Sequence, residues 1–178
     1  MTSRILRKDF IQETYIHGYA RYLLKPLLQL APEEIRREPL TEGSMENPSQ
    51  LLLSRGPLVV GSAGNQGALN NRYSTADCDV VELRLDSLGN SEGVHEFIER
   101  HRESLPLLLT ARHPDEGGLN ALSGSQRAKI LSEFLPLGML LDLELQSIGE
   151  LKPVWESARD AGMVRIASWH DFTRCPTR

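Results

Sequence analysis

Short apolar runs that alternate with helical patterns are the feature that most constrains the fold of this chain. Amphipathic helical patterns lie between the later runs, at residues 94–103, 125–135 and 148–162. The runs start near residues 58, 79, 106, 139 and 163, and such intervals are typical of successive β/α units in a parallel sheet. The pattern predicts an α/β fold, as a doubly wound sheet or a (β/α)8 barrel. The five runs are LVVGSAG (58–64), CDVVELRLD (78–86), LPLLLTAR (105–112), GMLLDLEL (138–145) and MVRIASWHDF (163–172).

The number of β/α units is small for a barrel. A (β/α)8 barrel takes about 250 residues, or about 200 at the least, whereas the chain has 178 residues. Residues 45–178 hold five units, so a barrel would be truncated and would present an open strand edge at each end. We therefore expect a chain that is marginally stable alone, or that pairs with a second copy of itself or with a complementing chain.

The N-terminal segment has a different character from the rest. Residues 1–44 carry a formal charge of +1, and residues 45–178 carry -5. Aromatic and aliphatic residues recur there at helical spacing and predict a helix from Lys8 to Lys25. The sequence is thus divided into a helical extension, 1–44, and a partial barrel, 45–178. Two interpretations stay open: a docking helix, or a translated stretch ahead of a natural start at Met45.

Composition excludes several classes of function. The net charge is -4 and no basic block occurs, which argues against a nucleic-acid partner. No apolar run reaches the length of a membrane span, and Asp9 and Glu13 interrupt any secretory signal. Cys78 and Cys175 form no CxxC pair, so a reducing compartment is expected. The sequence therefore predicts a cytoplasmic protein without a membrane or nucleic-acid partner.

Polar and charged side chains gather at the C-terminal ends of the predicted strands. A parallel strand that is buried on both faces is ordinarily apolar throughout, and a buried charge must be paired or used. One interpretation is a structural network of ion pairs. The recurrence over four strands favours instead a site at the mouth of a barrel for a polyhydroxylated or anionic small molecule. These residues are Glu82, Arg84, Asp86, Thr110, Arg112, Asp142, Glu144, Ser168, His170 and Asp171.

Four of these strand ends resemble, in order, motifs of the type I 3-dehydroquinate dehydratase family. The motifs read E-x-R-x-D, T-x-R-x-x-x-E-G-G, I-D-x-E-L and S-x-H-D-F-x-x-T-P. The matching segments are ELRLD (82–86), LLLTARHPDEGG (107–118), LLDLEL (140–145) and SWHDFTRCPT (168–177), and the resemblance covers about residues 56–178. It implies the first five β/α units of a (β/α)8 barrel. It also implies a carbon–oxygen lyase of the shikimate pathway of aromatic amino-acid biosynthesis, which dehydrates 3-dehydroquinate to 3-dehydroshikimate without a metal or an organic cofactor.

The resemblance also implies roles for individual residues. His170 is the general acid/base, and Glu116 orients it. Glu82, Arg84 and Arg112 match the residues that hold the substrate hydroxyls. In the family a lysine forms a Schiff base with the substrate ketone and makes it an electron sink.

Two departures from the family pattern bear on activity. Cys175 stands where the motif has threonine, and none of the chain's lysines lies at a predicted strand end. We therefore expect a fragment of a dehydratase, or a chain that is inactive alone. The alternative is a dehydroquinase-like module that binds a ligand or a partner without catalysis. The lysines are Lys8, Lys25, Lys129 and Lys152.

Overall fold

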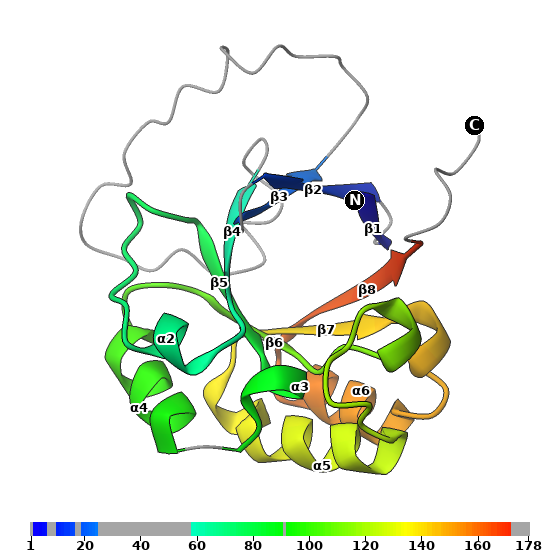
Figure 1. Ribbon diagram of the computed structural model, residues 1–178. Coiled ribbons are helices and arrows are strands. Elements are labelled where there is room, and N and C mark those ends of the chain that lie inside the picture. The colour runs from blue at the N-terminus through cyan, green and yellow to red at the C-terminus, as the bar shows by residue number, and fades with distance from the viewer. Residues whose placement is uncertain (1, 7–9, 17–18, 25–57, 91, 172–178) are drawn as a thin grey trace.

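The structure is a computed structural model, and it describes residues 2–6, 10–16, 19–24, 58–90 and 92–171 (Figure 1). Side chains are described within 58–90 and 92–171. The predicted boundary between residues 44 and 45 and the position of Cys175 lie outside these ranges.

Five parallel strands form the main part of the sheet, as the sequence predicted. Each pairs with the next along the chain, so the sheet runs from β4 to β8 without a crossover in strand order. This order is that of a (β/α)8 barrel and not of a doubly wound sheet, in which the strand order reverses. The strands are β4 (Leu58–Ala63), β5 (Val80–Arg84), β6 (Leu107–Thr110), β7 (Leu140–Glu144) and β8 (Val164–His170).

Helices connect these strands and cover the outer face of the curved sheet (Figure 1). The three longest coincide with the predicted helical patterns. Local sequence sets their starts: Ser123 and Gln126 form a capping box at α5, and Pro153 lies in the first turn of α6. The α-helices are α2 (Gln66–Leu69), α3 (Leu85–Leu88), α4 (Glu92–His101), α5 (Gly124–Phe134) and α6 (Lys152–Asp160), and the 3-10 turns are η2 (Pro114–Glu116), η3 (Leu135–Leu137) and η4 (Leu145–Ser147).

The N-terminal segment forms strands, so the helix predicted from Lys8 to Lys25 is wrong. Strands β1 (Thr2–Leu6), β2 (Phe10–Ile16) and β3 (Tyr19–Leu24) pair with one another in antiparallel fashion. β3 also pairs with β4, and β1 pairs with β8, which closes the sheet. The segment is rich in Ile, Thr, Tyr and Phe, which favour strands. The edges of β4 and β8, predicted to be open, are therefore paired.

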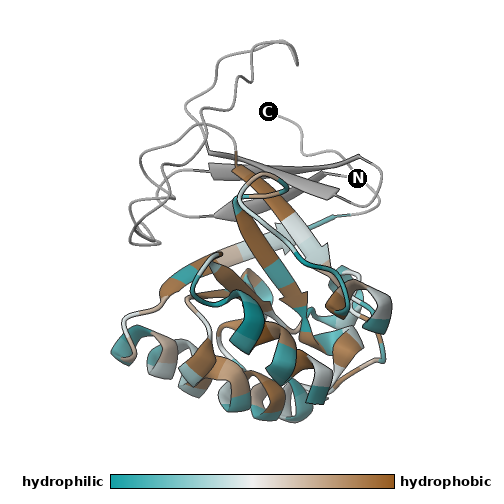
Figure 2. Ribbon diagram, turned by 90° about the vertical axis from the view of Figure 1, so that its left-hand side faces the viewer, coloured by the Kyte–Doolittle hydropathy of each residue, from teal (hydrophilic) through white to brown (hydrophobic). Residues whose placement is uncertain are grey.

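The side chains of the parallel strands divide between two apolar clusters. Outward residues such as Leu83, Leu109 and Leu141 pack against the helices, while inward residues such as Leu108 and Leu140 pack inside the barrel. In Figure 2 apolar colour follows the described parallel strands and alternates with hydrophilic colour around the helices. The inward cluster fills the barrel interior only around the N-terminal ends of the parallel strands. Polar residues follow it toward the C-terminal end of each of these strands. Its buried members are Leu58, Val60, Val80, Leu108, Leu140, Val164 and Ile166.

None of the described helices is long and apolar enough to cross a membrane. The longest of them, α5, has 11 residues.

Candidate active site

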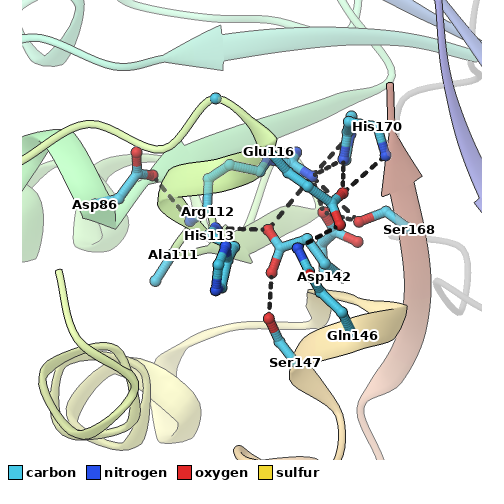
Figure 3. Close-up of polar contacts among 12 residues, drawn as sticks. Asp86, Ala111, Arg112, His113, Glu116, Asp142, Gln146, Ser147, Ser168 and His170 are labelled. Atoms are coloured by element: carbon cyan, nitrogen blue, oxygen red, sulfur yellow. Dashed lines mark hydrogen bonds and ion pairs between the residues drawn. The ribbon is translucent and has the colours of Figure 1, made fainter. Parts of the chain in front are cut away.

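Beyond the inward apolar cluster, the inward side chains become polar and charged at the C-terminal ends of the strands (Figure 3). They continue the same parity: Glu82 follows Val80 on β5, and Asp142 follows Leu140 on β7. All of them are buried. The polar group consists of Glu82, Arg112, Asp142, Glu144, Ser168 and His170.

Arg112 lies at the centre of this group, immediately after β6. Its Nη2 is 3.3 Å from Glu82 Oε1, and its Nη1 is 3.0 Å from Asp142 Oδ2. Nη1 also donates to Ser168 Oγ at 3.1 Å and lies 3.7 Å from Glu144 Oε1. One guanidinium thus faces three buried carboxylates from β5 and β7. Such a cation is suited to bidentate recognition of oxygen atoms on a ligand.

His170 is held between Arg112 and Glu116. Its Nδ1 is 2.9 Å from Glu116 Oε2, and its backbone N–H donates to the same oxygen at 2.7 Å. Arg112 Nη1 is 2.8 Å from His170 Nε2 and 3.0 Å from Nδ1. Arginine can only donate, and an ionised carboxylate can only accept. Since Glu116 accepts from Nδ1, we take Nδ1 as the protonated nitrogen and Nε2, the nearer of the two to Nη1, as the accepting one.

Glu116 reaches His170 from a tight loop after β6. Its other oxygen, Oε1, accepts from Gln146 Nε2 at 2.9 Å. The loop folds back on itself at a glycine pair: Gly117 has φ +86°, and a Cβ at Gly118 would lie 2.2 Å from the Arg112 carbonyl oxygen. Glycine is required at Gly118 because the backbone passes too close for a side chain. The E-G-G sequence therefore places the carboxylate as well as supplying it.

Arg84 lies at the rim of the site and binds Asp86. Its Nε and Nη2 donate to the two Asp86 oxygens at 2.9 Å each, and Nη2 also donates to the Gly117 carbonyl at 3.0 Å. Asp86 also accepts from the backbone N–H groups of Arg112 and Leu119. Burial alone would raise the pKa of Asp86, but the hydrogen bond and charge of Arg84 lower it below its usual value. This pair fixes the loop that carries Glu116.

Two carboxyls on β7 have pKa values shifted in opposite directions. Burial raises the pKa of Asp142 to about 6, although Arg112 opposes the shift. Its Oδ1 has no hydrogen-bond partner among the described residues. Burial also acts to raise the pKa of Glu144, but the charges of Arg112 and Arg127 outweigh it and lower that pKa. Glu144 is therefore the firmly ionised member of the two.

The structure brings together all five residues singled out from the sequence, four of them directly and the fifth, Arg84, through Asp86. Glu82, Arg112, Glu116 and His170 form one connected group, and Arg84 joins it through Asp86. The described side chains hold no cluster of three or more His, Cys, Asp or Glu residues suited to a metal ion.

Several contributors were missed from the sequence. Ser62 donates to Glu82 Oε2 at 2.9 Å, Gln146 binds Glu116, and Arg127 on α5 binds Glu144 at 2.5 Å. Only Arg127 had a readable signal: it shares a helical face with Ile130 and Phe134, which are buried. An arginine on an apolar face indicates a buried partner.

Comparisons with known proteins agree with the motifs. A family model described as type I 3-dehydroquinase matches residues 57–178. Over 101 residues the chain is 35% identical to a 3-dehydroquinate dehydratase of Aquifex aeolicus. This alignment covers 55% of the chain and 45% of the relative. Over 124 residues it is 33% identical to that of Methanothermobacter thermautotrophicus, covering 68% and 50%.

A solved structure gives the same result for the fold. The 3-dehydroquinate dehydratase of Enterococcus faecalis matches with a TM-score of 0.52 and 28% identity, over 66% of this chain and 55% of that one. The chain spans about half the length of the curated relatives it matches.

Proposed function

The chain belongs to the type I 3-dehydroquinase family, and on that basis we propose that its strand-end site binds 3-dehydroquinate and transfers protons during its dehydration. The observation that carries the proposal is the buried His170, whose Nδ1 is held by Glu116 and whose Nε2 is directed at Arg112. A histidine oriented in this way by a carboxylate is suited to general acid/base chemistry near neutral pH.

Substrate binding falls to the charged residues around His170. 3-Dehydroquinate carries a carboxylate, a ketone and hydroxyl groups. Arg112 and Arg84 supply donors for its oxygen atoms, and Glu82 supplies an acceptor for a hydroxyl. A substrate oxygen that takes the Arg112 Nη1 donor would release His170 Nε2, which Nη1 contacts at 2.8 Å. Binding would thereby prepare the base.

The proton transfers then follow from the position of His170. Nε2 removes a proton from the carbon next to the substrate ketone, the C–H electron pair forms a double bond to the ketone carbon, and the carbonyl π pair moves onto the ketone oxygen. That pair then returns to re-form the carbonyl, and the carbon–carbon double bond shifts by one position as the carbon–oxygen bond breaks. The same nitrogen gives its proton to the leaving hydroxyl, which departs as water. Glu116 accepts the hydrogen bond from Nδ1–H throughout and stabilises the charged imidazole between the two transfers.

The Schiff-base amine is the part of the family mechanism that the described residues do not supply. The lysines among them, Lys129 on α5 and Lys152 on α6, are exposed on helices and not at strand ends. We expect no adduct on Lys129 or Lys152 when the chain is treated with 3-dehydroquinate and borohydride. Mass spectrometry of the digested protein checks this, and an adduct on either lysine would contradict it.

The placement of these two lysines also favours the second candidate, a dehydroquinase-like module that binds a ligand or partner without turnover. Both candidates share the same ligand site and differ in catalysis. For both we propose a cytoplasmic location, because Cys78 and Cys175 form no CxxC pair and two cysteines make no disulfide framework.

Titration calorimetry with 3-dehydroquinate, together with an ultraviolet assay for the enone product, tests the proposal. We expect saturable binding that is lost in Arg112→Lys and kept in Arg159→Lys, an exposed control on α6. Binding with turnover that disappears in His170→Gln supports the dehydratase, and binding without turnover supports the non-catalytic module. A folded chain that does not bind 3-dehydroquinate would overturn both.

A further inference from the structure

Among the residues whose side chains the structure describes, Arg127 is the largest that is fully buried, and the proposed chemistry does not use it. It lies on α5, on the side of the sheet opposite to the barrel interior, and it has no exposed surface. A guanidinium removed from water is costly unless its donors are satisfied. Its contacts therefore indicate what the position requires.

Those contacts converge on the segment that carries Arg112. Arg127 Nε donates to the carbonyl oxygen of Ala111 at 2.7 Å. Its Nη2 binds Glu144 Oε2 at 2.5 Å, and its Nη1 donates to Ser147 Oγ at 3.0 Å. Ser147 Oγ in turn donates to Glu144 Oε2 at 3.0 Å.

Glu144, the partner of Arg127, binds the backbone on the C-terminal side of Arg112. Its Oε1 accepts from the backbone N–H of His113 at 2.9 Å. The pair Arg127–Glu144 thus binds the peptide groups on both flanks of Arg112, the carbonyl of Ala111 before it and the amide of His113 after it. Figure 3 shows these three residues in succession beside the carboxylates. η2, which carries Glu116, begins at the residue after His113.

The pair also balances charge behind the site. Arg112 faces Glu144 at 3.7 Å, whereas Arg127 binds that carboxylate at 2.5 Å. Because Arg127 pairs with Glu144, Arg112 makes its short contacts with Glu82, Asp142 and His170 instead. Without it, the buried charge of Glu144 would have Arg112 as its nearest cation and would draw that guanidinium away from His170.

We propose that Arg127 is a positioning residue of the ligand site: through Glu144 it fixes the backbone on both sides of Arg112, and so sets where Arg112 and Glu116 meet His170. The inference deepens the proposed function and rests on it for its effect on ligand binding. Its effect on the free protein stands independently.

The first experiment measures the free protein by amide hydrogen exchange and NMR. Arg127→Lys keeps the charge but lacks the fork that reaches Ala111, Ser147 and Glu144 together. We expect exchange at His113 N–H to be faster by about tenfold, the cost of one backbone hydrogen bond. The side-chain signals of Arg112 and His170 should shift as well.

Ile130→Val is the matched control, because Ile130 lies on the same buried face of α5 and has no part in the pair. It should accelerate core amides without singling out His113 or moving the His170 ring signals. If Arg127→Lys and Ile130→Val give the same pattern, Arg127 is only a packing residue and the inference is overturned.

Two further variants guard against unfolding. Ser147→Ala removes the hydroxyl between Arg127 and Glu144 and should reproduce the His113 effect in weaker form. Arg127→Met/Glu144→Gln removes both charges but keeps an acceptor for His113, so it should restore protection relative to Arg127→Met. An unchanged His113 in Ser147→Ala and in a folded Arg127→Lys would contradict the proposal.

The second experiment repeats the calorimetric titration with 3-dehydroquinate. Binding to Arg127→Lys should weaken by about tenfold, while Ile130→Val should bind as the parent does. If the parent chain itself does not bind, the proposed function fails, and the exchange result at His113 still decides the role of Arg127. If the parent binds and Arg127→Lys binds equally well, the inference fails and the proposed function stands.

Discussion

The interior of the barrel consists of two layers that are equally buried and opposite in chemistry. The apolar layer contains Leu58, Val60, Val80, Leu108, Leu140, Val164 and Ile166. The charged layer contains Glu82, Arg112, Asp142, Glu144, Ser168 and His170. On β5, β7 and β8, side chains on the same parity of one strand contribute to both layers, so strand geometry does not distinguish them.

The layers differ in whether their stability depends on the exact positions of neighbouring groups. Apolar side chains gain free energy from leaving water, and that gain scales with the area buried. Each member of the charged layer instead loses its hydration on burial. That cost in free energy is offset only by protein partners at hydrogen-bond or ion-pair distance. The charged layer is thus a costly way to fill a barrel. Its value lies in fixed donors and acceptors, which a ligand site needs.

The largest expected effect comes from removing the central cation of the charged layer. Arg112→Met leaves Glu82 and Asp142 without their shared partner, and we expect a loss of about 3–5 kcal/mol in the free energy of unfolding. Urea denaturation followed by circular dichroism measures it. A stability equal to that of the parent would show that the charged layer is solvated and not a buried network.

The apolar layer should respond differently. Leu140→Ala creates a cavity and should cost about 2–4 kcal/mol. The affinity for 3-dehydroquinate should stay unchanged in the fraction that remains folded, as measured by calorimetry well below the unfolding midpoint. Leu141→Ala, one residue along but facing the helices, is the control. A change in affinity confined to Leu140→Ala would mean that the layers are coupled.

The pH dependence sharpens the comparison at Asp142. The folded protein has a pKa of about 6 at this carboxyl, against an ordinary value of 3.8, so the folded state retains a proton that the unfolded chain has lost between those values. The stability from this proton is complete below 3.8 and is lost as the pH rises through 6.

Asp142→Asn should therefore gain stability relative to the parent as the pH rises from 4 to 7. The gain is at most about 3 kcal/mol, since one pKa unit corresponds to about 1.4 kcal/mol. Because only the difference between variant and parent is used, the contribution of Asp86, which is not coupled to Asp142, cancels. Parallel pH profiles for the two proteins would contradict the assignment.

The smallest effect on stability is expected at Glu116. Glu116→Gln keeps an oxygen for His170 but loses the charge that strengthens the hydrogen bond. The free energy of unfolding should therefore fall by about 1 kcal/mol. The consequence should be seen in the His170 ring nitrogens by NMR, as a mixture of tautomers in place of the form protonated at Nδ1. An unaltered tautomer would remove Glu116 from its orienting role.

The sequence predicted members of both layers but missed Arg127, which lies behind the charged layer on α5. Alternation in LLDLEL and the apolar start of LPLLLTAR were enough to place Leu108 and Leu140 on strands, and the motifs singled out Arg112, Glu116 and His170. Arg127 left a local signal, its place on the buried face of α5, but its partners Ala111, Glu144 and Ser147 lie 16 to 20 residues away along the chain. The local pattern could indicate a buried partner but not which groups Arg127 binds.

The N-terminal strands illustrate the opposite error. Tyr15, Tyr19 and Tyr22 recur at intervals of three and four, which is helical spacing, yet they belong to β2 and β3. The pairing of β3 with β4 and of β1 with β8 decides the conformation, because unpaired strand edges on either side are available to them. Local periodicity could not contain that information.

The most direct test of the central claim is an NMR titration of the labelled chain with 3-dehydroquinate. The account predicts saturable shifts of the Arg112 guanidinium and His170 ring signals, with the methyl signals of Leu108, Leu140 and Val164 almost unmoved. Shifts spread equally over both layers, or none at all in a folded chain, would contradict the claim that the charged layer is the ligand site.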